Sequence, residues 1–379
     1  MSETTVQAYV DGVEGVRLKL IGIGGAGCNT VNRLVTGGLY GAVTIAANTD
    51  KQHLDTIRAH QKILLGPSVT KSHGAGGNPE VGRIAAEESI EEIRQALQDS
   101  DLVFIAAGLG GGTGTGAAPL VAKVAKELGA IVVGVVTMPF RFEGNVRRRI
   151  AIRGLEELQK YTNTVVVIDN NRLLELYPQY NLKTAFSLAD EVINNMILSI
   201  TESIVKPSLI NIDFEDFKAV VGQGKLASLG IGRSSSPNRA EEATFNALQS
   251  PLLEGTFDGI TAAIVHVTGG EDMKLKEASR PPEIISELMG DEGLVVWGAR
   301  IDNYYASTMQ VALILTGLSS VAVTSIGESE PVVNLEADEA QKIAAKTYLP
   351  HNENVQEKEE DELEKLIAEL GIKRLNAER

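Results

Sequence analysis

The sequence predicts an α/β protein in which a parallel-sheet nucleotide-binding domain is joined by a long central helix to a smaller α+β domain. Three observations lead to this prediction. Short runs of Val, Ile and Ala alternate with amphipathic segments between residues 16 and 169, the pattern of strands buried on both faces of a parallel sheet. Glycine-rich loops follow several of these runs. An apolar periodic segment at residues 186–205 then precedes a second set of strands and helices.

In the first region we expect strands at residues 18–21, 43–47, 102–107, 131–137 and 164–168. We expect helices at residues 28–35, 79–97, 117–128 and 145–160. Ligands of such sheets bind at the carboxyl ends of the strands, and the glycine loops fall there.

The central segment carries apolar residues at helical spacing, namely Val192, Ile193, Met196, Ile197, Ile200 and Ile204. Pro207 ends it. Beyond it we expect strands at residues 219–221, 260–267, 294–299, 309–315 and 321–325, and helices at residues 240–250, 271–277 and 284–289.

The last segment differs in character. Acidic residues outnumber basic ones from residue 327 to the end, which predicts a solvated linker. Within it, Leu363, Leu366, Ile367 and Leu370 recur at the spacing of an amphipathic helix. This helix could dock on its own domain or enter the groove of a partner, and the sequence leaves both readings open.

Charge and composition narrow the class of protein. The formal net charge is −15 and the sequence pI about 4.9, which disfavours nucleic acid and anionic lipid as direct partners. Cys28 is the only cysteine, so no intramolecular disulfide can form, as suits a reducing cytosol; we interpret it as a packing residue rather than a nucleophile. No run reaches 18 apolar residues, and polar residues 1–15 do not resemble a signal peptide. We therefore expect a cytoplasmic protein with no membrane insertion.

The most specific motif is the loop of five glycines and two threonines at residues 110–116. It lies between an expected strand and an expected helix, where backbone N–H groups and the helix N-terminus favour a phosphate. It lacks the Gly-Lys-Ser/Thr of a Walker A loop. A flexible linker is the plain alternative, but linkers rarely separate a buried strand from a helix.

A second loop, from Gly22 to Gly27, matches G-x-G-x-x-G, and Asp50 follows at the position expected for a ribose-binding acid. Alone, it would favour an NAD-dependent oxidoreductase. One dinucleotide pyrophosphate does not need two glycine cradles, however, and no His or Tyr suggests a hydride site. A nucleotide with a longer phosphate chain could use both loops.

Three further clusters complete the pattern: a third glycine loop at residues 73–79, the segment PFRFEGNVR at residues 139–147, and NIDFED at residues 211–216. With GGGTGTG, they resemble FtsZ, the bacterial and archaeal homologue of tubulin, over residues 16–326. The resemblance implies a GTP-binding domain at residues 16–185, a central helix at 186–208 and an α+β domain at 209–326, flanked by a flexible N-terminus (1–15) and the acidic tail (327–379).

The resemblance also implies roles for individual residues in binding GTP or GDP. Gly24, Gly25, Gly27 and Asn29 would contact the α-phosphate and nucleoside side. The β- and γ-phosphates would be cradled by Gly110, Gly111, Gly112, Thr113, Gly114 and Thr115, and the γ-phosphate sensed by Ala75, Gly76, Gly77 and Asn78. Glu143 would hold the ribose, Arg147 would lie near the phosphates, Phe186 would stack on the base and Asp190 would accept from guanine.

Each of these side chains has a structural alternative. Glu143 and Arg147 could form only a helical ion pair, Phe186 could belong to the core, and Asp190 could be an exposed helix charge. Many relatives carry asparagine at the position of Asp190; aspartate preserves the acceptor. The five histidines are scattered and suggest no transition-metal site.

For catalysis, the resemblance implies that Asn211, Asp213 and Asp216 reach the γ-phosphate of the next subunit in a head-to-tail homopolymer, with Mg²⁺ neutralising charge. The alternative for the carboxylates is a helix cap. The implied function is a self-assembling GTPase, activated by polymerisation, that forms filaments at the mid-cell division site. A division protein or membrane anchor would bind the tail. A paralogous filament with another role and a non-catalytic scaffold are the remaining readings.

Overall fold

The computed structural model describes residues 16–39, 41–171, 194, 197–198, 200–201, 204, 208–250 and 259–318. One ten-stranded sheet runs through this part of the chain in the order β3-β2-β1-β4-β5-β6-β7-β10-β8-β9. Every neighbouring pair is parallel except the two that involve β10. The described protein is therefore an α/β fold with a mostly parallel sheet, as predicted.

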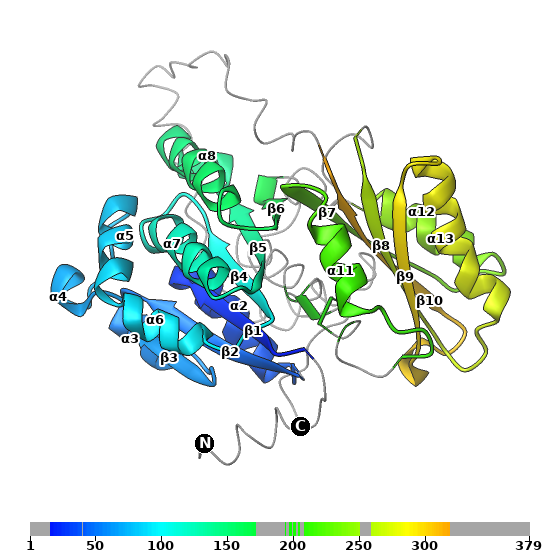
Figure 1. The fold of residues 1–379 in the computed structure, drawn as a ribbon, viewed down its shortest axis with the longest axis horizontal. Coiled ribbons are helices and arrows are strands. Elements are labelled where there is room, and N and C mark those ends of the chain that lie inside the picture. Colours follow the sequence, from blue (N-terminus) through cyan, green and yellow to red (C-terminus); the bar gives the residue numbers. More distant parts are fainter. Residues whose placement is uncertain are drawn as a thin grey trace, which may run out of the picture.

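The first six strands form the blue-to-green half of the molecule in Figure 1. They are β1 (Leu18–Ile23), β2 (Ala42–Asn48), β3 (Gln61–Leu64), β4 (Leu102–Gly108), β5 (Ile131–Met138) and β6 (Thr164–Asp169). The helices between them are α2 (Gly24–Thr36), α3 (Lys51–Thr56), α4 (Pro67–Thr70), α5 (Pro79–Glu88), α6 (Ile90–Leu97), α7 (Thr113–Glu127) and α8 (Asn145–Gln159), with a 3₁₀ turn η1 (Arg141–Glu143). The strands that the sequence predicted here are all present, and β3 is an additional one.

The second half contains β7 (Leu226–Ser234), β8 (Ala262–Gly269), β9 (Leu294–Ile301) and β10 (Met309–Thr316). Its helices are α11 (Phe214–Val221), α12 (Arg239–Leu248) and α13 (Leu275–Met289), with a 3₁₀ turn η2 (Asn303–Tyr305). In Figure 1, α13 lies at the end of the molecule beside β9, α12 packs on β7 and β10, and α11 lies between the two halves. Within the sheet, the two halves are connected by a short ladder. β6 pairs with β7 at only two positions, Val165 with Leu226 and Val166 with Ala227.

Three apolar clusters hold the layers together. One runs along a single face of the whole sheet, where α2 and α11 pack, and it includes Phe104, Ile200 and Phe217. The opposite face is covered by α5 to α8 in the first half and by α12 and α13 in the second. The inner strands are thus largely buried on both faces, which explains why they appear in the sequence as continuous apolar runs rather than alternating ones. The edge strands β3 and β9 are more exposed.

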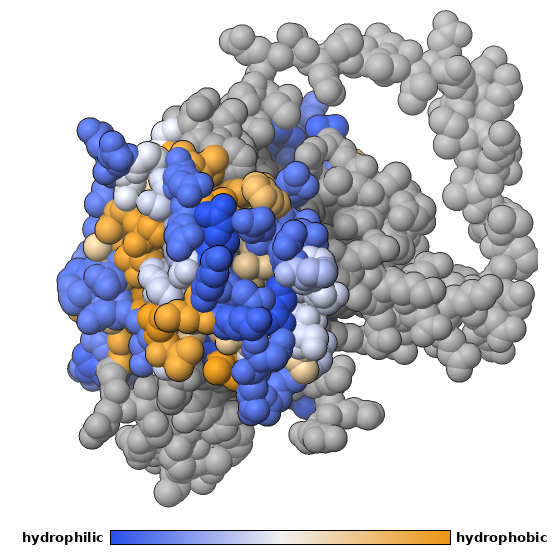
Figure 2. All heavy atoms as spheres, turned by 90° about the vertical axis from the view of Figure 1, so that its right-hand side faces the viewer, coloured by the Kyte–Doolittle hydropathy of each residue, from blue (hydrophilic) through white to orange (hydrophobic). Residues whose placement is uncertain are grey.

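The surface at the end of the molecule formed by the second half is mixed in hydropathy. Figure 2 shows hydrophobic and hydrophilic areas interspersed on this side. The exposed apolar residues of the elements here include Phe245 on α12, Leu275 and Leu288 on α13, and Tyr304 on η2. No described helix is long and apolar enough to span a membrane.

Two glycine loops are shorter than the sequence suggested, because the following helices begin inside them. The helix expected from Cys28 begins at Gly24, and the one expected from residue 117 begins at Thr113. Gly24 has φ +71°, which a side chain would strain. The glycine backbones therefore form the first helical turns themselves, which points their N–H groups toward the carboxyl edge of the sheet.

Three other predictions were wrong in detail. Residues 79–97 form two helices, because buried Ser89 donates to the Leu64 carbonyl and accepts from the Gly66 N–H, which breaks the helix. Residues 219–221 are the last turn of α11 and not a strand. Residues 275–289 form one helix despite Pro281 and Pro282, whose rings are buried and whose fixed φ suits a helix.

Several predictions concern residues outside the described part. These are the N-terminus (1–15), the strand at 321–325, the tail (327–379), Phe186 and Asp190. Of the central segment, the described residues 194, 197, 198, 200, 201 and 204 are helical. Ile197 and Ile200 belong to the core, as the periodicity predicts.

Candidate functional site

The three glycine loops meet at the carboxyl edge of the sheet. A methyl group added at Gly24 would lie 3.0 Å from the backbone nitrogen of Gly114, so the loops after β1 and β4 touch. One added at Gly112 would lie 2.7 Å from the Ala75 side chain and 2.9 Å from the Asn78 nitrogen. The loop at residues 73–79 therefore packs on the loop after β4, although 30 or more residues separate them in the chain.

Hydrogen bonds fix the geometry of this cradle. The hydroxyl oxygens of Thr49, at the end of β2, and Thr113, at the start of α7, lie 2.6 Å apart. The buried Thr115 hydroxyl accepts from the Gly110 N–H at 2.9 Å. Asn78 caps α5 by accepting from the Glu80 N–H at 3.0 Å. Thr113, Thr115 and Asn78 thus hold the loops rigidly in addition to any contact they make with a ligand.

Some residues of the cradle are exposed and others are buried. Gly25, Gly76, Gly77 and Asn29 are exposed, whereas Gly24, Gly27, Ala75, Gly110, Gly112 and Gly114 are buried. A side chain at Gly27 would collide with the Ala106 carbonyl at 2.1 Å. The buried glycines therefore let the loops approach one another, and the exposed ones leave backbone open to a ligand.

Glu143 and Arg147 lie at the neighbouring corner, after β5. Arg147 donates to Glu143 Oε2 at 2.5 Å, and the other carboxylate oxygen accepts from the Phe140 N–H at 3.0 Å. The ion-pair alternative is thus present in the structure. Each carboxylate oxygen can accept a second hydrogen bond, so the pair does not prevent Glu143 from binding a ribose. A methyl group added at Gly110 would lie 3.0 Å from the carbonyl oxygen of Arg147, so the start of α8 lies next to the glycine cradle.

Asn211, Asp213 and Asp216 lie in and beside the loop before α11 and are all exposed. Asn211 accepts from the Ser208 N–H at 2.7 Å, and Asp213 accepts from the Glu215 N–H at 2.9 Å. The helix-cap alternative is therefore correct for Asp213. Within the described part of the chain, the hydrogen bonds of Asn211 and Asp213 are local and do not reach the glycine loops.

The sequence reasoning missed the segment after β2. Asn48, Thr49 and His53 link this segment to α2 and α7. Its position in the sequence could have identified this segment, because it directly follows a buried strand and so lies at the carboxyl edge of the sheet, as the glycine loops do. Asn170, after β6, was also missed: it is buried and its Oδ1 has no partner among the described residues.

Two other readings from the sequence can be tested against the structure. The Asp50 carboxylate accepts from the His53 N–H at 3.1 Å and caps α3, a local role that weakens the dinucleotide reading. The Cys28 side chain is fully buried, and burial raises the pKa of its thiol to about 12. Cys28 is a packing residue, as predicted. In the described residues no group of three or more His, Cys, Asp or Glu side chains could hold a metal ion.

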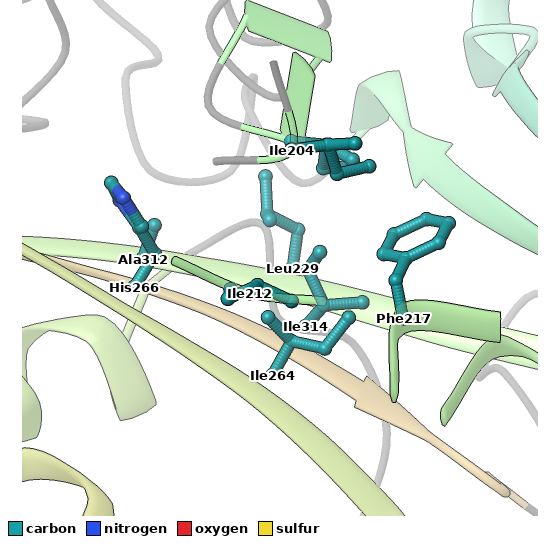
Figure 3. A pocket seen from close by; sticks show the side chains of 9 residues that line it. Ile204, Ile212, Phe217, Leu229, Ile264, His266, Ala312 and Ile314 are labelled. Atoms are coloured by element: carbon teal, nitrogen blue, oxygen red, sulfur yellow. The ribbon is translucent and has the colours of Figure 1, made fainter. Parts of the chain in front are cut away.

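An apolar cavity lies away from this edge, between the described end of the central segment and the strands of the second half (Figure 3). It is lined by apolar side chains that include Ile204, Ile212, Phe217 and Leu229, and by the imidazole of His266. Its walls are apolar, so it is not a second phosphate site.

The fold and the cradle define a class of protein: an α/β protein whose glycine loops gather at one edge of the sheet, an arrangement that suits a phosphorylated ligand. Residues 17–178 match the model of the Tubulin/FtsZ family, GTPase domain, and residues 225–319 match that of the FtsZ family, C-terminal domain. The chain belongs to the FtsZ family of tubulin-like GTPases.

Curated relatives and solved structures agree with this placement. The chain is 49% identical to cell division protein FtsZ 1 of Methanocaldococcus jannaschii, over 80% of this chain and 84% of the relative. It is 48% identical to FtsZ 2 of the same organism, over 80% of each. A structure titled as an empty FtsZ dimer of M. jannaschii has 46% identity and a TM-score of 0.79, and covers 89% of this chain and 99% of that one.

Proposed function

We propose that this protein binds GTP across the three glycine loops and hydrolyses it when subunits assemble head to tail. Residues 16–185 form the GTP-binding domain, 186–208 the central helix and 209–326 the domain that carries the catalytic loop. The convergence of the loops after β1, β4 and residue 73 at one sheet edge carries the proposal, because a triphosphate is long enough to use all of them.

In this proposal Gly24, Gly25, Gly27 and Asn29 bind the α-phosphate side, residues 110–115 hold the β- and γ-phosphates, and residues 75–78 sense the γ-phosphate. Glu143 binds the ribose hydroxyls, and Arg147 supplies a nearby cation. Phe186 stacks on the base and Asp190 accepts from the guanine N1–H and N2–H₂. The Oδ1 atom of Asn170 is a buried acceptor at the same edge. We propose that it accepts a hydrogen bond from a donor group of the nucleotide.

The catalytic groups come from the neighbouring subunit. Asn211, Asp213 and Asp216 are exposed, so a partner can reach them. An exposed apolar side chain lies near each of the two surfaces that would meet in a filament. Leu209 is 65% exposed beside the proposed catalytic loop, and Val146 is 61% exposed beside Arg147. Burial of such side chains favours association. The solved structure of an FtsZ dimer from M. jannaschii supports self-assembly, and a head-to-tail contact that does not close produces a filament.

Magnesium completes the proposed chemistry by neutralising phosphate charge. This ion often binds through phosphate oxygens and water, with only one or two protein ligands. The proposal therefore needs no dedicated cage of carboxylates. The protein's contribution is to position the attacking water by means of the two aspartates.

In the cell we propose a filament at the mid-cell division site in the cytoplasm. Its tail at residues 327–379 would bind a division protein or membrane anchor. The similar identities to the FtsZ 1 and FtsZ 2 relatives favour neither a main division protein nor a paralogue with another role.

The decisive experiment is a GTPase assay over a range of protein concentration, with light scattering recorded in parallel. We expect the rate per molecule to rise steeply at the concentration where scattering appears, because each active site needs two subunits. A constant rate per molecule, down to monomeric samples, contradicts the shared site. Absence of GTP turnover at every concentration contradicts the enzymatic assignment itself.

A further inference from the structure

A chain of hydrogen bonds connects the end of β2 to the first helix of the glycine cradle. The Asp50 N–H donates to Asn48 Oδ1 at 3.4 Å. Asn48 Nδ2 lies 3.1 Å from His53 Nδ1, and His53 Nε2 lies 3.0 Å from Asn29 Oδ1. The imidazole of His53 thus bridges Asn29 of α2 and the last residue of β2, Asn48.

The direction of each bond follows from its neighbours. Because Asn48 Oδ1 accepts from the Asp50 N–H, the amide nitrogen of Asn48 faces the imidazole. An amide nitrogen can only donate, so His53 Nδ1 must be the acceptor. The proton of a neutral imidazole then resides on Nε2, which donates it to Asn29 Oδ1. The chain is complete only when His53 is neutral and carries its proton on Nε2.

This arrangement determines how Asn29 presents its amide. Its oxygen is occupied by His53, and its Nδ2 makes no hydrogen bond to the described residues. Asn29 is exposed in the second turn of α2, just after Gly27. The held amide therefore offers two N–H donors and no competing acceptor at the edge where an anionic ligand is proposed to bind.

We infer that His53 is a positioning residue for nucleotide binding: it holds the Asn29 amide so that Nδ2 donates to an oxygen of the bound guanine nucleotide. The inference rests on the proposed function, since it requires a nucleotide in the cradle. Orienting the amide before binding removes its rotational freedom in advance, and so raises affinity. Asn29 touches the ligand, whereas His53 acts only through Asn29.

The test compares four variants of the full chain: His53→Ala, His53→Gln, Asn29→Ala and the double variant Asn29→Ala/His53→Ala. Affinity for GDP is measured by displacement of a fluorescent GDP, at protein concentrations below the onset of scattering. Glutamine is the matched control because its oxygen can accept from Asn48 and its nitrogen can donate to Asn29. Thermal melts of each variant report the structural effect separately.

We expect His53→Ala to weaken GDP binding by about threefold to tenfold, the effect of one lost hydrogen bond. His53→Gln should bind within about twofold of the unmodified protein. In the Asn29→Ala background, the additional His53→Ala change should have no effect on affinity, because the residue it positions is absent.

Other outcomes overturn the inference. Affinity unchanged in His53→Ala, while the unmodified protein binds GDP, contradicts the positioning role alone. Equal losses in His53→Ala and His53→Gln, or a loss that persists in the Asn29→Ala background, mean that His53 acts through the fold rather than through Asn29. If the unmodified protein does not bind GDP, the proposed function fails and this inference fails with it.

Discussion

The Asp213 carboxylate accepts a hydrogen bond from the Glu215 N–H at 2.9 Å. This contact makes Asp213 the N-cap of α11, with an extended backbone at φ −67° and ψ 144°. A residue proposed to polarise water on a neighbouring subunit therefore also begins a helix in its own. The two roles can be separated by substitution, because a cap needs only an acceptor whereas the proposed chemistry needs a carboxylate.

Asp213→Ala should abolish most GTP turnover and also lower the free energy of unfolding by about 1 kcal/mol, the usual effect of a lost cap. Asp213→Asn should abolish turnover with little effect on stability, because asparagine caps as well as aspartate. Both variants should bind GTP normally as monomers. Turnover assays, urea unfolding and nucleotide titration measure the three quantities. Loss of nucleotide binding by the monomer in either variant would show that this loop serves its own subunit's nucleotide.

Asp190 should determine the choice of base. In the proposed binding mode, Asp190→Ala leaves the guanine donors without an acceptor, which costs about 1–3 kcal/mol, so the preference for GTP over ATP should collapse. Asp190→Asn is the control, because its amide oxygen preserves an acceptor. Competition binding with both nucleotides provides the measurement. Unchanged selectivity in the alanine variant would locate the base elsewhere.

Arg239 should stabilise the second half of the fold. Its side chain is 8% exposed and donates to both carboxylate oxygens of Glu277, at 2.9 and 3.0 Å, and to Asp272 at 2.6 Å. Arg239→Ala leaves the carboxylates of Glu277 and Asp272 without their cation, so we expect the free energy of unfolding in urea to fall by about 2–3 kcal/mol. This is less than the usual loss from a fully buried pair, because the carboxylates keep part of their hydration. Arg280→Ala removes an exposed cation from Glu241 and should have a smaller effect.

The same cluster predicts a pH dependence. Hydrogen bonding to Arg239 lowers the pKa of Glu277 from its ordinary value of 4.5 and that of Asp272 from 3.8. A carboxyl group whose pKa is lower in the folded chain adds stability above the unfolded value and loses it as the pH falls through the folded value. Stability should therefore decline below about pH 4.5. The decline should be shallower in Glu277→Gln, and melting curves at several pH values would measure it. An identical pH profile in that variant would contradict a contribution from this pair.

Deleting residues 350–379 should leave filaments and GTP turnover intact and abolish localisation in the cell. The reason is the isolated apolar face of Leu363, Leu366, Ile367 and Leu370 in an acidic segment, which suits a partner groove. Fluorescence microscopy and a turnover assay test the two halves of the expectation. A large drop in melting temperature on truncation would instead support a helix docked on its own domain.

All the strands of the first half except β3 could be predicted, because each of them is largely buried on both faces and so is continuous in apolar residues. β3 was missed because its first two residues, Gln61 and Lys62, are polar and exposed. β7 was missed, because Gly230 and Gly232 interrupt its apolar pattern. A side chain at Gly232 would lie 2.2 Å from the Ala243 carbonyl of α12, so this glycine serves a helix contact that local pattern cannot reveal.

α11 was missed for a different reason. Residues 219–221 are a short apolar run, which periodicity alone does not assign to a strand or a helix. The start signal was present: Asp213 precedes Glu215 and Asp216, acidic residues in the first turn of a helix. Those aspartates were interpreted first for catalysis and only alternatively as a helix cap, and no helix was predicted after them.

The sequence by itself determined the class of the fold and the kind of ligand, because buried strands, glycine loops and helix starts are local patterns of residue type. It also placed those loops at one edge, since the carboxyl ends of parallel strands meet there. Only the tertiary structure decided which loops touch. Thr49 meets Thr113, 64 residues further along the chain, and His53 lies between Asn29 and Asn48. Such contacts depend on how helices and strands pack across the sheet, and no local periodicity carries that information.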